Sequence, residues 1–190
     1  MIGVSVFAAM TVLLAGYAGA LYKALLRARL RLARAWSSLE FAWDRREGEI
    51  TRLLELCEQD NPRAREANER AERARTALHA ARSQHDIAAV NEAEGALRSA
   101  LLELYPIAAR HPQLPADTLL RALRLRMRAH ERAIAAYREG YNDAAKALNA
   151  RIELLPDSLI AGLCHFAPTP LLEFSATPTA DIDLGLAFSK

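Results

Sequence analysis

Histidine and cysteine are the residues of this chain whose chemistry would first suggest catalysis or metal binding. The five histidines are spread along the 190 residues, at His79, His85, His111, His130 and His165. No two of them have the spacing of an H-E-x-x-H zinc motif, which needs two histidines one helical turn apart beside a carboxylate. The two cysteines form neither a metal-binding nor a redox motif. We therefore predict no metal site, no catalytic residue and no cofactor.

Other patterns that carry chemistry are also missing from the sequence. No serine lies in a Gly-x-Ser-x-Gly elbow, and no glycine-rich loop is present to hold a phosphate. The net charge of +2 gives the chain no overall attraction to nucleic acid, and no aromatic residues are interleaved with its basic ones. The sequence predicts a protein that is not an enzyme and has no nucleic-acid partner.

The N-terminal segment has the length and composition of a membrane span. Residues 1–22 contain no charged side chain, and as a helix they would be about 33 Å long, enough to cross a hydrocarbon layer of about 30 Å. A membrane-proximal basic cluster follows, consisting of Lys23, Arg27, Arg29, Arg31 and Arg34. Because basic residues beside a span stay in the cytoplasm, we predict a single-pass protein with its N-terminus outside and the rest of the chain in the cytoplasm. The cluster is also suited to binding anionic lipid.

A cleavable signal peptide is a second interpretation of this segment. Ala18-Gly19-Ala20 has the small residues of a cleavage site, although no basic residue precedes the apolar run. The sequence leaves open whether the segment is ever cleaved. Lipid attachment is excluded, because Tyr17 stands where a lipobox needs a cysteine.

The rest of the chain predicts long amphipathic helices. Cap residues and prolines divide it into helices that end near residues 59, 82, 110 and 155, with a short helix at 157–163 and a bend at Pro106. The last long helix has a coiled-coil-like stripe with a period of seven, made of Leu120, Met127, Ile134, Tyr141, Leu148 and Leu155, and Leu123, His130, Tyr137 and Ala144 are interleaved with it at steps of three and four. The helix that ends near residue 82 has a stripe of small residues, made of Ala64, Ala67, Ala71, Ala74, Leu78 and Ala81. We predict an all-α fold, an N-terminal transmembrane helix followed by an antiparallel four-helix bundle with long helices. The predicted division is an anchor at 1–22, a bundle at 23–166 and an irregular tail at 167–190.

Two tryptophans share one helix stripe with an arginine. Trp36 and Trp43 are seven residues apart, and Arg46 lies on the same face. The tryptophans are predicted to be packing residues of the core. A buried Arg46 needs a partner, and Glu94, the one carboxylate on the stripe of its helix, is our candidate for a buried pair. The alternative is that Arg46 extends its guanidinium to water along the edge of the bundle.

Two stretches of the sequence resemble the LemA family. The stretch "ARAWSSLEFAWDRR" is similar to the family signature at Trp36, Arg45 and Arg46, among other positions. A longer stretch, "YNDAAKALNARIELLPDSLIAGLCHF", is similar to the family at Tyr141, Asn142, Asn149 and Pro156. The chain departs from the family at His165, where glycine is usual.

The resemblance implies a role in the bacterial cell envelope rather than a reaction. LemA-like proteins are single-span membrane proteins with a helical bundle, their molecular function is not established, and relatives occur with membrane metalloproteases. We expect a membrane-anchored, non-enzymatic helical adaptor or scaffold in the bacterial inner (cell) membrane. Its expected partners are the lipid bilayer and other membrane proteins, and self-association into a homo-oligomer is left open. The alternative is an accessory or regulatory subunit of a membrane metalloprotease or transport system.

Overall fold

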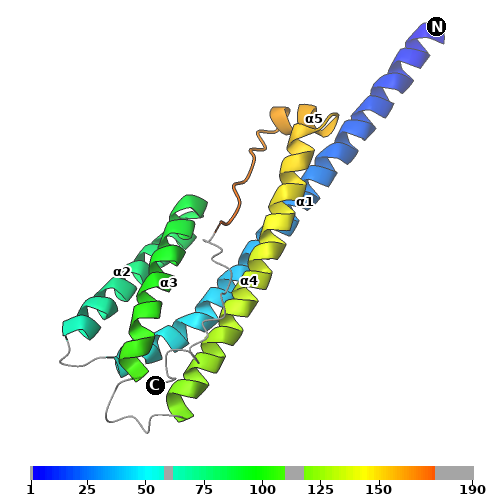
Figure 1. Cartoon of the computed structure of the whole chain (residues 1–190). Helices are drawn as coiled ribbons and strands as arrows, with labels where there is room; N and C mark the ends of the chain where they lie inside the picture. The colour runs from blue at the N-terminus through cyan, green and yellow to red at the C-terminus, as the bar shows by residue number, and fades with distance from the viewer. Residues whose placement is uncertain (1, 58–61, 110–117, 174–190) are drawn as a thin grey trace. The chain divides into compact units, whose positions relative to one another are not determined.

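Five helices make up the parts of the chain that the structure, a computed structural model, describes: residues 2–57, 62–109 and 118–173. They are α1 (Ile2–Leu56), α2 (Pro62–Gln84), α3 (Ile87–Ala109), α4 (Thr118–Glu153) and α5 (Asp157–Leu163) (Figure 1). These ranges contain no strand, so the predicted all-α fold is confirmed. The helix ends expected near residues 59 and 110 lie outside the described residues.

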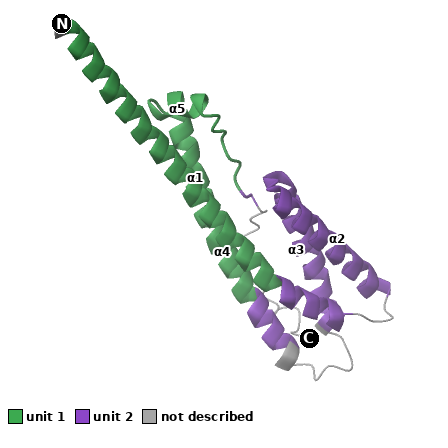
Figure 2. Cartoon of the chain, turned by 180° about the vertical axis from the view of Figure 1, so that it is seen from behind, with its two compact units in different colours: residues 1–46, 128–171 green, residues 47–127, 172–190 purple. Residues whose placement is uncertain are grey.

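The chain forms two compact units, to which α1 and α4 both contribute (Figure 2). Unit 1 contains residues Met1–Arg46 and Arg128–Leu171, and unit 2 contains Glu47–Met127 and Leu172–Lys190. This division groups residues by their contacts within the chain. The predicted division into anchor, bundle and tail instead follows the order of segments along the sequence. That earlier division stays a prediction.

In unit 1, the first part of α1 and the second part of α4 lie side by side and run in opposite directions, with α5 at the end of α4 (Figures 1 and 2). The N-terminal part of α1 projects beyond α5 (Figure 2). It contains an 18-residue window with a mean hydropathy of 1.9, none of which is buried. An apolar helix without protein contacts is compatible with a membrane anchor.

In unit 2, α2 and α3 form an antiparallel pair joined by a tight turn. The buried face of α2 consists of small residues and one leucine, namely Ala64, Ala67, Ala71, Ala74, Leu78 and Ala81. Such a face buries little area but lets a neighbouring helix come close. The turn depends on Asp86, whose N–H donates to the Ala81 carbonyl at 3.0 Å and whose Oδ1 accepts from the Ala89 N–H at 3.1 Å. One residue therefore closes α2 and caps α3.

The predicted core stripes are buried, with two corrections on α4. In α1, Trp36, Trp43 and Ile50 are buried, as is Cys57 directly after the helix, and in α4 so are Leu120, Met127, Ile134, Tyr141 and Leu148. The prediction was wrong for Leu155, which is 75% exposed. The reason is that α4 ends at Glu153, so Leu155 no longer follows the helical period. Tyr137, which was assigned to the interleaving positions of the same stripe, is 42% exposed. Pro106 lies inside α3, and the bend at this position stays a prediction.

The end of α5 explains why glycine is favoured at position 165. The Phe166 N–H donates to the Ala161 carbonyl at 2.9 Å and the His165 N–H to the Gly162 carbonyl at 3.4 Å, which together form a Schellman motif. This motif places one residue in the left-handed region, and His165 has φ of 56°. A side chain in that conformation costs about 1 kcal/mol, which glycine avoids.

Replacing His165 with glycine is expected to stabilise the end of α5 by about 1 kcal/mol, because the left-handed strain is removed. Hydrogen exchange on the full chain in detergent micelles should show the Phe166 amide protected about fivefold more than in the wild type. His79→Gly is the control, since His79 is an exposed residue inside α2 and glycine there destabilises the helix. Unchanged or faster exchange at Phe166 in His165→Gly would contradict the strain.

Candidate functional site

The membrane-proximal basic cluster lies on α1 just after the apolar window. All five members, Lys23, Arg27, Arg29, Arg31 and Arg34, are exposed. The Arg27 Nε donates to the Lys23 carbonyl at 3.2 Å, which leaves the rest of its guanidinium at the surface. A positive surface beside an apolar helix suits anionic lipid headgroups.

An aromatic cluster in unit 1 connects α1 to α4. The Trp36 ring contacts both Trp43 and Tyr141 edge to face, with ring centroids 5.7 Å apart in each pair. The three residues are at most 5% exposed. Burial raises the pKa of Tyr141, so its hydroxyl stays neutral. This hydroxyl donates to the Pro170 carbonyl at 3.5 Å. Of the signature residues, Trp36 therefore packs between two helices, α1 and α4.

Asn149 holds the segment that follows α5 against α4. Its Nδ2 donates to the Thr169 carbonyl at 2.8 Å, and its Oδ1 accepts from the Thr169 N–H at 2.8 Å. The side-chain amide thus pairs with both backbone groups of one residue, as a neighbouring strand would. We call the two Asn149–Thr169 hydrogen bonds the clasp. Together with the Tyr141–Pro170 hydrogen bond, the clasp holds the segment around residues 169 and 170 against α4, although Thr169 comes 20 residues after Asn149 and Pro170 comes 29 residues after Tyr141. The resemblance singled out both residues, but no sequence pattern pointed to their partners, Pro170 and Thr169.

Substituting Asn149 by alanine removes both hydrogen bonds of the clasp. Since each contributes about 1 kcal/mol net, we expect the segment around Thr169 to open more easily by about 2 kcal/mol. Hydrogen exchange of the Thr169 amide should accelerate about thirtyfold in the full chain. Lys146→Ala, at an exposed position one turn earlier on α4, should leave that exchange unchanged. Similar acceleration in both variants would mean that the segment is held by something other than Asn149.

Arg46 is a buried cation in unit 1 with a carboxylate beside it. It is 3% exposed, and its Nη1 donates to Glu131 Oε1 of α4 at 3.0 Å. The interpretation in which its guanidinium reaches water along the bundle edge is therefore wrong. Glu94, the partner we predicted, is also buried but belongs to unit 2, and the Arg46–Glu94 pair stays a prediction. The adjacent Arg45 is exposed, and its guanidinium lies 4.6 Å from the centroid of the Phe41 ring.

The other two family positions are Asn142, inside α4, and Pro156, between α4 and α5. Asn142 is half-buried, and Pro156 precedes α5 at its N-terminal cap position. Arg151 donates to Asp157 Oδ2 at 2.9 Å across this turn, so the pair fixes the angle between α4 and α5. Pro156 with the Arg151–Asp157 pair therefore ends one helix and starts the next.

Unit 2 contains two ion-pair groups that sequence reasoning missed. The buried Glu49 is contacted by Arg52 at 3.1 Å and Arg126 at 3.0 Å. Arg75 of α2 donates to Glu72 at 2.7 Å and from its Nε to Glu47 of α1 at 2.7 Å. The sequence signals were the spacings of three residues in Glu49–Arg52 and Glu72–Arg75, which are equally common on solvated helix faces. The Glu49–Arg126 and Glu47–Arg75 pairs join helices within unit 2.

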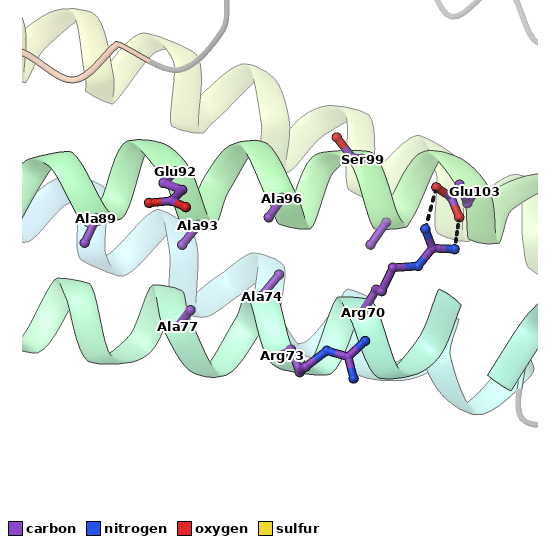
Figure 3. A pocket seen from close by; sticks show the side chains of 11 residues that line it. Arg70, Arg73, Ala74, Ala77, Ala89, Glu92, Ala93, Ala96, Ser99 and Glu103 are labelled. Carbon is purple, nitrogen blue, oxygen red and sulfur yellow. Dashed lines mark hydrogen bonds and ion pairs between the residues drawn. The ribbon is translucent and has the colours of Figure 1, made fainter. Parts of the chain in front are cut away.

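A groove of about 590 Å³ runs between α2 and α3 (Figure 3). Its lining is mostly alanine, and Arg70 crosses one end to form an ion pair with Glu103. Figure 3 shows Ala89, Ala93 and Ala96 of α3 on the side of that helix that faces α2. The Ser99 hydroxyl donates to the Gly95 carbonyl of its own helix at 3.0 Å. The groove offers an apolar contact surface with charged edges rather than a set of reactive groups.

The two cysteines have opposite surroundings. Cys57 is buried in unit 2, where its thiol donates to the Leu104 carbonyl at 3.7 Å. Burial raises the pKa of the Cys57 thiol to about 11, so it stays protonated and unreactive at neutral pH. Cys164 follows α5 and is exposed. Among the described residues, no group of three or more His, Cys, Asp or Glu side chains is placed to hold a metal ion.

These features define an all-α protein whose first helix combines an apolar stretch, compatible with a membrane anchor, with a packed amphipathic part. Residues 35–184 match the model of the LemA family, and the chain belongs to that family. The matched range contains Trp36, Asn149 and Pro156. Comparisons with curated proteins and with solved structures found no match.

Proposed function

We propose that this LemA-family protein is a membrane-anchored helical adaptor, which presents its packed helices to other proteins of the bacterial cell envelope without catalysing a reaction. The observation that carries the proposal is the continuity of α1. Within unit 1, one unbroken helix runs from the unburied apolar window to the contact of Trp36 with Tyr141. The anchor and the packed part of this unit therefore share a helix axis instead of being joined by a flexible linker.

The aromatic cluster gives this continuity a mechanical consequence. Both tryptophans follow the basic cluster on α1 and are buried, with Trp36 against Tyr141 of α4 and Trp43 against Trp36. Large edge-to-face aromatic contacts resist sliding of one helix along another. A partner that binds unit 1 would therefore meet a surface with a defined direction relative to the anchor.

The charge pattern supports a cytoplasmic location for the packed helices. Five exposed basic residues follow the apolar window, and no acidic residue occurs before Glu40. This asymmetry keeps the C-terminal flank of a first span in the cytoplasm. The proposal therefore places the N-terminus outside the cytoplasmic membrane.

Labelling of single cysteines tests the proposed orientation. Two variants of a Cys164→Ser chain carry Gly3→Cys and Gln84→Cys, and the buried Cys57 contributes little background. A membrane-impermeant maleimide should label position 3 in intact cells and position 84 only after the membrane is permeabilised. Labelling of position 84 in intact cells would reverse the orientation, and extraction of the protein by alkaline carbonate would refute the anchor.

Cross-linking in living cells tests the adaptor role. A photoreactive amino acid at Ala96, an exposed position in the α2–α3 groove, should give cross-links to membrane proteins. The matched control adds Leu13→Arg and Leu14→Arg, which oppose insertion by about 3 kcal/mol each and should abolish those cross-links. Capture of one metalloprotease or transporter at fixed stoichiometry would favour the accessory-subunit alternative instead. Cross-links only between copies of this chain, or none, would contradict the adaptor.

A further inference from the structure

The corner between α4 and α5 in unit 1 carries a group of large exposed apolar side chains. Its leucines, each between 63% and 76% exposed, are Leu154, Leu155, Leu159 and Leu163. The opposite face of α5 is held to the unit through Ala161, which is 1% exposed. Four leucines facing outward at one corner mark an interaction surface. We call them the corner leucines.

The corner leucines lie beside the part of α1 where the apolar window ends. Phe166, which follows α5, contacts Tyr22 of α1 edge to face with ring centroids 6.4 Å apart. The guanidinium of Arg29 lies 5.9 Å from the centroid of the same Phe166 ring. Both views of unit 1 show α5 next to this part of α1 (Figures 1 and 2). Tyr22 is the last residue before the basic cluster, so α5 is level with the expected membrane surface.

We infer that the corner leucines are a second membrane contact, which enters the headgroup and upper acyl region of the same leaflet that the basic cluster faces. This inference rests on the proposed membrane anchoring through α1. Exposed leucines beside arginine and lysine are the composition of an interfacial element, with the apolar groups in the bilayer and the cations at its anionic headgroups.

The surrounding charges fit lipid as the occupant. On α1, the cations nearest to Phe166 and Tyr22 are exposed, and that stretch contains no acidic residue that would weaken their attraction to anionic lipid headgroups. The acid at the start of α5, Asp157, is paired with Arg151 and adds no free negative charge. An aromatic side chain such as Tyr22 is also favoured at the membrane–water boundary. With the span and the corner both in the bilayer, unit 1 is held at two points and cannot rotate freely about α1.

The test measures membrane depth on the full chain reconstituted in vesicles of phosphatidylcholine and anionic phosphatidylglycerol. The native Cys164, adjacent to Leu163, is labelled with the environment-sensitive dye NBD, and the vesicles contain lipids with a nitroxide near the headgroup. We expect blue-shifted emission that these lipids quench strongly. In Leu159→Gln with Leu163→Gln, quenching at Cys164 should fall at least threefold. Leu125→Gln, which changes a comparably exposed leucine in unit 2, should leave it unchanged.

A second dye position separates this inference from the anchor on which it rests. NBD at Leu13→Cys in a Cys164→Ser chain should be quenched by lipids with a nitroxide deep in the acyl chain. If position 13 is quenched and Cys164 is not, the corner does not touch the membrane and the inference alone fails. If position 13 is not quenched either, the proposed anchoring fails as well. A blue shift at Cys164 without lipid quenching, together with Cys164–Cys164 cross-links in a separate sample of the unlabelled chain, would show that a second copy covers the leucines and would overturn the inference.

Discussion

Replacing Trp43 with alanine should lower the free energy of unfolding by about 3–5 kcal/mol, the range for deleting a large buried aromatic side chain. Trp43 is 1% exposed and packs edge to face on Trp36, which in turn contacts Tyr141 of α4. The substitution leaves a cavity inside the aromatic cluster and removes one of its ring contacts. The cost exceeds that of a methylene deletion because a large aromatic loses both its burial and its specific ring geometry.

Pulse proteolysis of the full chain in nonionic detergent, across a urea series, measures this loss. Phe41→Ala is the matched control, because Phe41 is an aromatic residue on the same helix but is 55% exposed. Among the aromatic and cation–π pairs described, its ring contacts only the guanidinium of Arg45. We expect that control to cost about 1 kcal/mol or less. Equal losses in the two variants would show that Trp43 does not belong to the core that holds α1 to α4.

The second large effect is expected at Arg46, where alanine should cost about 3 kcal/mol. The side chain is buried and donates to Glu131 at 3.0 Å, so truncation removes a charged hydrogen bond and the packing of its aliphatic stem. The partner is 34% exposed, which lets water rehydrate its carboxylate and keeps the cost at the lower end of the range for broken buried pairs. Arg46→Lys should recover part of the loss, since an ammonium keeps the charge but not the planar geometry.

The adjacent arginine provides the control for Arg46. Arg45→Ala removes the same side chain one position earlier, where it is exposed and lies over Phe41, and should cost about 1 kcal/mol or less. The same urea and proteolysis assay applies to all three variants. High salt should weaken the wild type little, because a buried pair is poorly screened. If Arg45→Ala and Arg46→Ala were equally mild, the buried pair with Glu131 would have no energetic role.

The sequence predicted most of the helices and their buried faces. Heptad spacing correctly placed Trp36 and Trp43 on a buried stripe, and an alanine stripe correctly marked the buried face of α2. These features are local, because a helix repeats every 3.6 residues whatever it packs against. The same reasoning failed at Leu155, where the period was carried past the end of α4.

The sequence also selected residues whose roles it could not supply. Resemblance to the family pointed to Asn149, but its partner Thr169 comes 20 residues later in a segment without helical period. Glycine is usual where His165 stands, yet the reason, a left-handed residue in a Schellman motif, needs the backbone angles. For Arg46, the stripe predicted that a buried guanidinium needs a partner and named Glu94, but it did not point to Glu131, which lies 3.0 Å away in the structure.

The amino-acid sequence by itself determined the all-α class, the apolar first helix with its basic flank, the buried stripes and the family. Only the tertiary structure decided that Glu131 lies beside Arg46, that Asn149 clasps Thr169 and that the corner leucines are exposed beside Tyr22 and Phe166. The physical reason is the separation along the sequence between the residues that interact. Helix formation and burial patterns follow from neighbours within two turns, whereas hydrogen-bond partners and surface patches depend on which distant segments the folded chain brings together.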